Sequence, residues 1–177
     1  MTDQKHQQRF AALWHEHRGI ALKVASIYAR GSEDRHDLVQ DIGMQLWRSF
    51  AGFDKRRAKF STWMYRVALN VAISHVRRRY RSLDEGVEPL DEIHLETVGG
   101  GAAIAEPDER LDKLYAVIAR LGELDRALML LYLEDRSYGE MAGILGISET
   151  NVATRLSRIK QKLRRQMAGD ASTPTGA

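Results

Sequence analysis

Two separated stretches of this sequence are rich in lysine and arginine, and their charge equips them to bind an anionic partner. Residues 55–83 hold nine basic side chains and no acidic one: Lys55, Arg56, Arg57, Lys59, Arg66, Arg77, Arg78, Arg79 and Arg81. Residues 148–165 hold six, opposed only by Glu149. Each lysine or arginine beside a phosphate releases condensed counterions, so two such blocks are typical of a protein that grips a polyanion at two places. Solvated helix faces remain the alternative explanation for either block taken alone.

The second basic block follows a pattern of capping residues that predicts a helix-turn-helix. Ser137 and Glu140 match a capping box, Gly146 supplies the turn, and Ser148 caps a final helix that reaches about Met167. One face of that helix is apolar, with Val152, Leu156, Ile159 and Leu163. The opposite face is hydrogen-bonding and basic, so it could meet base edges in the major groove, with its N-terminal residues nearest the bases.

The first part of the chain predicts a bundle of three helices around the other basic block. Apolar spacing indicates a first helix over residues 5–30, ended by Gly31. Ser32 is the expected N-cap of a second helix with the stripe Leu38, Ile42, Leu46 and Phe50. After a basic loop, Ser61 is expected to cap a third helix that reaches about Tyr80. We expect Trp14, Trp47 and Trp63 to be core anchors, because each lies on or beside an apolar stripe.

The middle of the chain predicts a flexible acidic linker between two small domains. Residues 84–112 hold ten acidic side chains against Arg110 alone, together with Pro89 and the triplet Gly99–Gly101. Two further helices, over about 111–121 and 127–133, precede the helix-turn-helix. We therefore expect an all-α fold with a three-helix domain over 1–81, the linker over 82–108, a four-helix domain over 109–168 and a disordered tail over 169–177.

Composition excludes several classes of function. The chain has no cysteine, so disulfides, thiolate zinc sites and cysteine nucleophiles are absent, and a cytoplasmic protein is expected. His15 and His17 match no zinc spacing. No phosphate-cradling glycine loop and no nucleophile–base constellation is found, so we expect neither an enzyme nor a cofactor. The polar N-terminus and the lack of long apolar runs indicate neither a signal peptide nor membrane insertion.

Three segments together resemble the extracytoplasmic-function (ECF) sigma factors of bacterial RNA polymerase. Asp37-Leu38-Val39-Gln40-Asp41, followed by Leu46-Trp47-Arg48, is similar to the region-two helix that docks on the coiled coil of the polymerase beta-prime subunit. Residues 59–70, KFSTWMYRVALN, resemble the segment that reads and opens the minus-ten element. Residues 137–158 resemble the region-four helix-turn-helix that binds the minus-thirty-five element. A helix-turn-helix alone is common, whereas this ordered combination is specific.

The resemblance implies three sets of binding residues. Those expected to bind core polymerase are Asp37, Leu38, Val39, Gln40, Asp41 and Trp47. Those expected at the minus-ten element are Phe53, Lys55, Arg56, Arg57, Lys59, Val67, Asn70, Arg77 and Arg78, and among them Phe53, Val67 and Asn70 would form a pocket for a flipped base. Those expected at the minus-thirty-five element are Ser148, Thr150, Asn151, Thr154, Arg155 and Arg158.

The resemblance also implies binding partners. This sequence differs from the family pattern at some positions, and two other functions remain as alternatives. The implied partners are core polymerase through its beta-prime coiled coil and beta flap, double- and single-stranded promoter DNA, and an anti-sigma factor. Gly43 stands where the family usually has a large apolar residue, the loop over 54–59 is unusually basic, and Gly122-Glu123 replaces a usual leucine-proline pair. The alternatives are a sigma mimic that titrates an anti-sigma factor, and a plain helix-turn-helix regulator. The second alternative leaves residues 37–70 unexplained.

Overall fold

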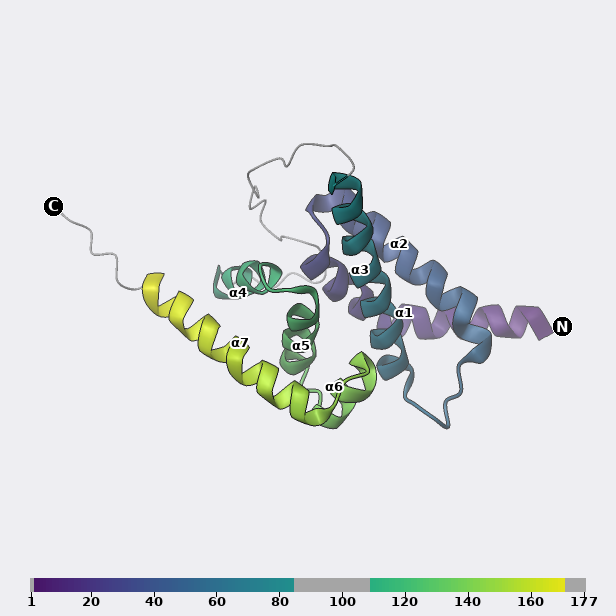
Figure 1. Ribbon diagram of the computed structural model, residues 1–177. Helices are drawn as coiled ribbons and strands as arrows, with labels where there is room; N and C mark the ends of the chain where they lie inside the picture. The colour runs from purple at the N-terminus through teal and green to yellow at the C-terminus, as the bar shows by residue number, and fades with distance from the viewer. Residues whose placement is uncertain (1, 85–108, 171–177) are drawn as a thin grey trace. The chain divides into compact units, whose positions relative to one another are not determined.

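The computed structural model describes residues 2–84 and 109–170, and within those ranges it contains seven α-helices, one short 3-10 helix and no strand (Figure 1). The predicted all-α fold class is therefore confirmed. The contacts divide the chain into two compact units, Met1–Ala119 and Arg120–Ala177. The predicted linker and tail fall mostly on residues 85–108 and 171–177, outside the described residues.

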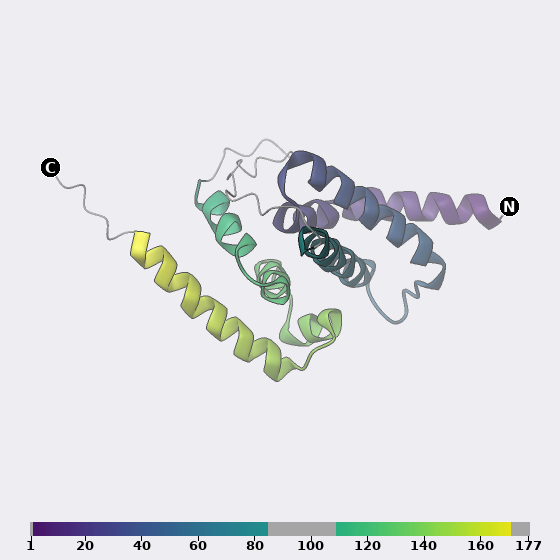
Figure 2. The ribbon, with the colours of Figure 1, turned by 45° about the horizontal axis from the view of Figure 1, so that its top comes forward.

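The first unit is built on a bundle of three long helices: α1 (Thr2–Tyr28), α2 (Gly31–Ser49) and α3 (Phe60–Asp84), with the short helix η1 (Phe50–Gly52) after α2. Each of the three contacts the other two, and Figure 2 looks almost along α3 with α2 beside it. Apolar residues at three- and four-residue spacing fill the shared core, all at most 2 % exposed: Ala21, Val24, Ala25, Tyr28, Leu38, Ile42, Leu46, Met64, Tyr65, Ala68, Leu69 and Ala72. The alanines among them allow close helix contacts, because interaxial distance depends on side-chain size.

The turn between α1 and α2 differs from the prediction. Helix α1 ends at Tyr28, and Gly31 has a φ of +81°, in the left-handed region that favours glycine. Helix α2 begins at Gly31, so Ser32 is not its N-cap. The Asp34 carboxylate instead accepts a hydrogen bond from the Arg30 backbone N–H at 2.7 Å. An acid inside the helix thus reaches back to the turn, which simple capping rules do not anticipate.

The start of α3 is also shifted, by two residues, because an N-cap at Ser61 would start the helix at Thr62. The Lys59 carbonyl accepts a hydrogen bond from the Trp63 N–H at 3.1 Å, so the helix begins at Phe60 and Ser61 lies inside it. Helix α3 continues to Asp84, four residues beyond the predicted end at Tyr80. Three residues assigned to the linker, 82–84, are therefore helical.

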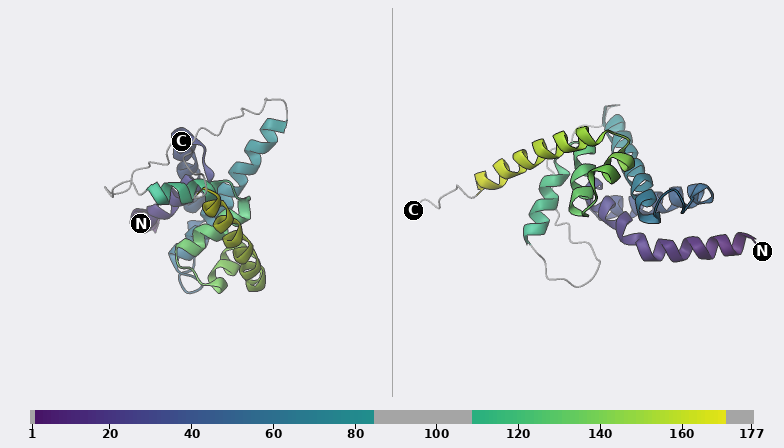
Figure 3. Two further views of the ribbon diagram at one scale, coloured as in Figure 1. Left: turned by 90° about the vertical axis from the view of Figure 1, so that its left-hand side faces the viewer. Right: turned by 90° about the horizontal axis from the view of Figure 1, so that it is seen from below.

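The second unit contains α5 (Glu123–Leu133), α6 (Tyr138–Leu145) and α7 (Glu149–Asp170). Ser137 and Glu140 form the predicted capping box, and Gly146 adopts a φ of +69° between α6 and α7. The Ser148 hydroxyl accepts a hydrogen bond from the Asn151 N–H at 3.1 Å and so caps α7. The predicted helix-turn-helix is confirmed, and Figure 3 shows α6 at the N-terminal end of α7.

Helix α4 (Glu109–Ala119) contacts α1 and groups with the first unit. The sequence placed this segment in the second domain, together with the helix-turn-helix. The predicted linker ends at residue 108, whereas the contacts divide the chain after Ala119. The domain boundary at residue 109 stays a prediction.

Candidate nucleic-acid interface

The face of α2 that points away from the bundle core carries a mixed polar and apolar stripe. Asp37, Gln40, Met44 and Trp47 follow one another at three- or four-residue spacing, Arg48 lies four residues after Met44, and all five are exposed. We call these five residues the α2 stripe. Met44 is 49 % exposed and Trp47 is 37 % exposed. Neighbouring large apolar side chains left open in this way are typical of a surface that a partner covers.

Only part of the predicted polymerase-binding set lies on the α2 stripe. Leu38 is fully buried at 0 % exposure, so its side chain belongs to the bundle core and is not available for docking. Val39 and Asp41 are half-buried at the two edges of the stripe. Met44 was missed by the sequence analysis, although it satisfies the same helical spacing as the predicted residues.

The tryptophans are less buried than the sequence indicated. The Trp47 ring lies at the surface, with its centroid 5.1 Å from that of Phe10 and 5.6 Å from that of His6, both on α1. Trp14 and Trp63 are half-buried. A β-carbon at Gly43 would lie 3.4 Å from Cη2 of Trp14. A side chain at position 43 would therefore contact the Trp14 ring.

A cluster of aromatic rings lies where η1, the following loop and the start of α3 meet. The Phe53 ring is 5.0 Å from Trp63 and 5.4 Å from Phe60, centroid to centroid. Trp63, Val67 and Asn70 then follow one another along a single face of α3, at spacings of four and three residues. Phe53 thus meets this face through Trp63, which the predicted pocket did not include. Asn70 is exposed and Val67 is half-buried, so the face is open to a ligand.

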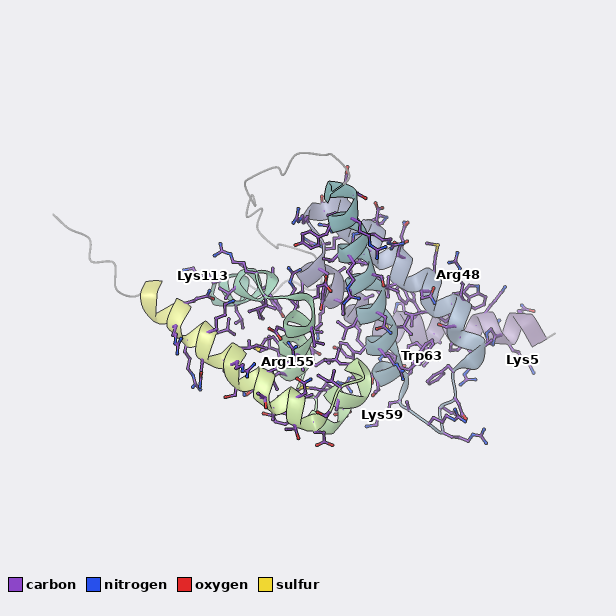
Figure 4. The ribbon with its side chains drawn as sticks, viewed as in Figure 1. Lys5, Arg48, Lys59, Trp63, Lys113 and Arg155 are labelled. Carbon is purple, nitrogen blue, oxygen red and sulfur yellow. The ribbon has the colours of Figure 1, made fainter. Side chains whose placement is uncertain are left out.

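The loop over residues 54–59 presents its cations unequally. The Asp54 carboxylate accepts hydrogen bonds from the Arg56 backbone N–H at 2.9 Å and from its guanidinium at 3.1 Å. These bonds from Arg56 lower the pKa of Asp54. Lys55, Arg57 and Lys59 are exposed as well but have no such carboxylate partner among the described residues. Lys59 and Trp63 are labelled near the start of α3 in Figure 4.

The far end of α3 is fastened to α2 by one carboxylate. Asp34 Oδ1 lies 2.7 Å from Nε2 of His75, and Asp34 Oδ2 lies 2.7 Å from Nη2 of Arg79. Burial would raise the pKa of Asp34, but the Arg30 amide, His75 and Arg79 outweigh that effect and lower it. Arg77 and Arg78 lie on the exposed side of the same helix segment. The ion cluster therefore holds the part of α3 that displays these two arginines.

The outward face of α7 places most of its predicted DNA-binding residues at the surface. Thr150, Asn151, Thr154 and Arg158 are exposed, whereas Val152, Leu156, Ile159 and Leu163 on the other face are at most 7 % exposed. Ser148 is exposed but is engaged as the N-cap. Arg155 is half-buried and forms an ion pair with Asp125 of α5 at 2.9 Å. The structure thus brings five of the six residues to one exposed end and turns the sixth toward α5.

Other kinds of site find no support in the residues that the structure describes. No group of three or more histidine, cysteine, aspartate and glutamate side chains there could hold a metal ion. None of the described helices is both long enough and apolar enough to cross a membrane.

Comparison with known proteins identifies the family. Residues 13–82 match the family model for sigma-70 region 2, and residues 111–163 match that for sigma-70 region 4. The RNA polymerase sigma factor CnrH of Cupriavidus metallidurans is 31 % identical, over 93 % of this chain and 90 % of that protein. The ECF sigma-E factor of Escherichia coli is 28 % identical, over 80 % of this chain and 78 % of that protein. The chain therefore belongs to the sigma-70 family of RNA polymerase sigma factors, and within it to the ECF group.

Solved structures agree with this fold. CnrH in complex with the cytosolic domain of CnrY superposes with a TM-score of 0.65 at 23 % identity, covering 94 % of this chain and 91 % of that one. The sigma factor RpoE in complex with the anti-sigma factor NepR from Bartonella quintana gives a TM-score of 0.66 at 20 % identity, covering 95 % and 98 %.

The family defines the biochemical activity. As an ECF sigma factor, the protein binds core RNA polymerase and directs promoter recognition, DNA opening and transcription initiation. Members of this family act by binding rather than by catalysing a reaction of their own.

Proposed function

We propose that three separate surfaces divide the work of initiation in this protein. The α2 stripe binds core polymerase through the beta-prime coiled coil, the loop over 54–59 with the exposed face of α3 holds the minus-ten DNA, and the outward face of α7 reads the minus-thirty-five DNA. One observation carries the proposal. The mixed stripe lies on α2, while the basic residues assigned to the minus-ten DNA lie on the loop and α3, so one surface can be covered by polymerase while the other holds DNA.

The polymerase-binding set follows from exposure. We assign Asp37, Gln40, Met44 and Trp47 as central contacts, with Val39 and Asp41 at the edges, and we exclude the buried Leu38. Truncating an anchor side chain at such an interface typically costs about 2 kcal/mol or more. The second unit would add a contact with the beta flap, as the family resemblance implies.

The minus-ten assignment joins an aromatic wall to a polar edge. A base that has left the duplex needs a flat apolar surface and a hydrogen-bonding group to offset the cost of unstacking. Phe53 and Trp63 supply the surface, Val67 lines it and Asn70 supplies the polar edge. Lys55, Arg57 and Lys59 follow the strand's phosphates, with Arg56 contributing less because Asp54 holds it. Arg77 and Arg78 reach the duplex upstream.

The α2 stripe could also be the binding site of a protein inhibitor. Two similar structures are complexes of a sigma factor with CnrY and with the anti-sigma factor NepR. We infer that an anti-sigma factor covers the α2 stripe of this chain and so competes with core polymerase. The protein would work in the cytoplasm, where the polymerase is, without catalysis or a cofactor of its own.

The test is assembly with purified core polymerase. Trp47→Ala and Asp37→Lys should each weaken binding to core by at least about thirtyfold, because each removes an exposed part of the stripe. Glu16→Lys is the matched control for the charge reversal, since Glu16 is exposed at 70 % on α1, outside the stripe. Its affinity should stay within about twofold of the wild type.

Two results, one from this binding assay and one from run-off transcription, would contradict the proposal. Unchanged binding by both stripe variants would show that polymerase docks elsewhere. A sigma mimic that only titrates an anti-sigma factor would bind the inhibitor but would not support run-off transcription with core.

A further inference from the structure

A relay of hydrogen bonds connects α5 to the DNA-facing end of α7. Nη1 of Arg155 donates to Oδ1 of Asp125 at 2.9 Å, and Nε of Arg155 donates to Oδ1 of Asn151 at 3.1 Å. Asp125 lies in the first turn of α5, and Asn151 lies one turn before Arg155 on α7. In Figure 4 Arg155 is labelled on the side of α7 toward α5. We call these three residues the α5–α7 relay.

The relay determines which end of the Asn151 amide is available. A guanidinium can only donate hydrogen bonds, so the atom that faces Nε of Arg155 is the amide oxygen. The Asn151 backbone N–H is engaged separately by the Ser148 hydroxyl at 3.1 Å. The amide nitrogen, with its two N–H groups, donates to none of the described residues, and the side chain is exposed. Asn151 therefore presents donors to whatever lies against this end of α7.

A donor-only amide reads bases differently from a free asparagine. A free asparagine pairs with adenine through both ends, since its oxygen accepts from N6 and its nitrogen donates to N7. Here one of the two lone pairs of the oxygen already accepts from Arg155, and the positive guanidinium beside it disfavours a second contact from the N6 amino group. Guanine offers two acceptors, N7 and O6, in the major groove, whereas the amino group of cytosine is a donor.

We propose that the α5–α7 relay makes Asn151 a donor-only reader that selects guanine over adenine at one position of the upstream promoter element. Arg155 and Asp125 are positioning residues in this scheme. Asp125 influences base choice from another helix, without touching a base. The inference rests on the proposed function of α7 and refines it, because it names the base class and the residues that set it.

The experiment measures base preference with the full chain assembled on core polymerase. Competition binding uses a promoter library with all four base pairs at each position of the upstream element. Asn151→Ala identifies the position, because the wild type should prefer guanine there by about tenfold over adenine and this variant should lose the preference. Arg155→Met and Asp125→Ala release the amide oxygen. Each should lower the guanine-to-adenine ratio by at least about threefold at that position and at no other.

Matched variants separate the relay from general effects. Lys162→Met removes one exposed positive charge from the same helix without touching the relay, so it should weaken all sequences alike. Asn151→Ala combined with Arg155→Met should show no further change in base preference beyond Asn151→Ala alone. Thermal unfolding of each variant shows that the second unit is folded, and a merely structural role of Asp125 would lower the unfolding temperature without moving base preference.

Failure of the inference and failure of the proposed function look different. If the wild-type holoenzyme binds equally well whatever the sequence of the upstream element, both the inference and the proposed function of α7 are wrong. Normal dependence on the element, with the same base ratios in Arg155→Met and Asp125→Ala as in the wild type, would overturn the inference alone. A preference for adenine at the Asn151 position in the wild type would overturn it as well.

Discussion

The two surfaces of this sigma factor that are assigned to DNA differ in how firmly their side chains are held. On α7, hydrogen bonds to Ser148, Arg155 and Asp125 hold the polar groups of the leading end in one arrangement. On α3 and its preceding loop, aromatic side chains stand half-open and most cations have no described carboxylate partner. Fixed donors suit a duplex, whose base edges have fixed positions. Half-exposed rings and exposed cations suit a single strand, which brings no fixed geometry of its own.

The largest expected effect on promoter opening tests the single-strand surface. Asn70→Ala should reduce permanganate-detected promoter opening by about tenfold or more, because a flipped base loses its polar partner. Phe53→Ala should have a similar effect, since stacking on an aromatic ring is worth about 1–3 kcal/mol per base. Binding to core and to duplex upstream DNA should stay near normal in both variants.

The same two variants can also show that the α3 surface does not bind a single strand. If Phe53 only supports the bundle through its contacts with Phe60 and Trp63, Phe53→Ala would lose thermal stability and core binding together. Asn70 is exposed, so its replacement should leave the unfolding temperature unchanged. If both variants open the promoter as well as the wild type does, the pocket has no role in promoter opening.

The next effect belongs to the duplex surface. Arg158→Ala should cost about 1–3 kcal/mol of promoter binding if Arg158 meets a guanine edge, and the loss should depend on sequence. If it meets a phosphate, the loss should be uniform and the salt slope should fall by about one. Binding to a set of promoter variants at several salt concentrations separates these cases. No change in either quantity would mean that α7 presents another face to DNA.

A third prediction concerns the carboxylate that anchors α3. The folded-state pKa of Asp34 lies below its ordinary value of 3.8, so its stabilising contribution is complete above that value and is lost as the pH falls through the lowered pKa. Asp34→Asn removes the charge at every pH. It should therefore lower the free energy of unfolding by about 1.5–3 kcal/mol near neutral pH, as expected for hydrogen bonds to a charged group.

The control for this prediction is the pH dependence itself. The difference in stability between wild type and Asp34→Asn should shrink when unfolding is measured below pH 3.8. A difference that is constant over that range would show that Asp34 acts through packing rather than through its charge. Asp34 lies in the first unit and is not part of the α7 surface, so upstream DNA binding should be unaffected at neutral pH.

The smallest expected effect separates two neighbouring arginines in the loop. Arg57→Gln should lower the salt slope of single-strand binding by about 0.7, the value for one phosphate contact. Arg56→Gln should change the slope less, because Asp54 already holds that guanidinium at 3.1 Å. Equal effects would show that the Asp54 contact opens when DNA binds.

Much of this molecule could be predicted from local sequence, because the signals were local. Helix periodicity, the capping box at Ser137 and Glu140, the turn at Gly146 and the two basic blocks all depend on residues within one or two turns of each other. The ordered motifs of regions two and four were enough to indicate the family. The helix starts at Gly31 and Phe60 were each missed by two residues, because neither Ser32 nor Ser61 is the N-cap of its helix, and at α2 the Asp34 carboxylate bonds the Arg30 amide instead.

Tertiary structure alone decided what each face of a helix meets. Periodicity places Leu38 on an apolar stripe and Trp47 beside it, but only packing against α1 and α3 buries the first and leaves the second 37 % exposed. Arg155 reads as a DNA contact in sequence, yet it pairs with Asp125, thirty residues earlier. Such pairs leave no trace in local spacing, because they exist only once two helices lie side by side. The sequence by itself thus determined the helices, the charges and the family, and the packing of helices determined which side chains remain free to bind.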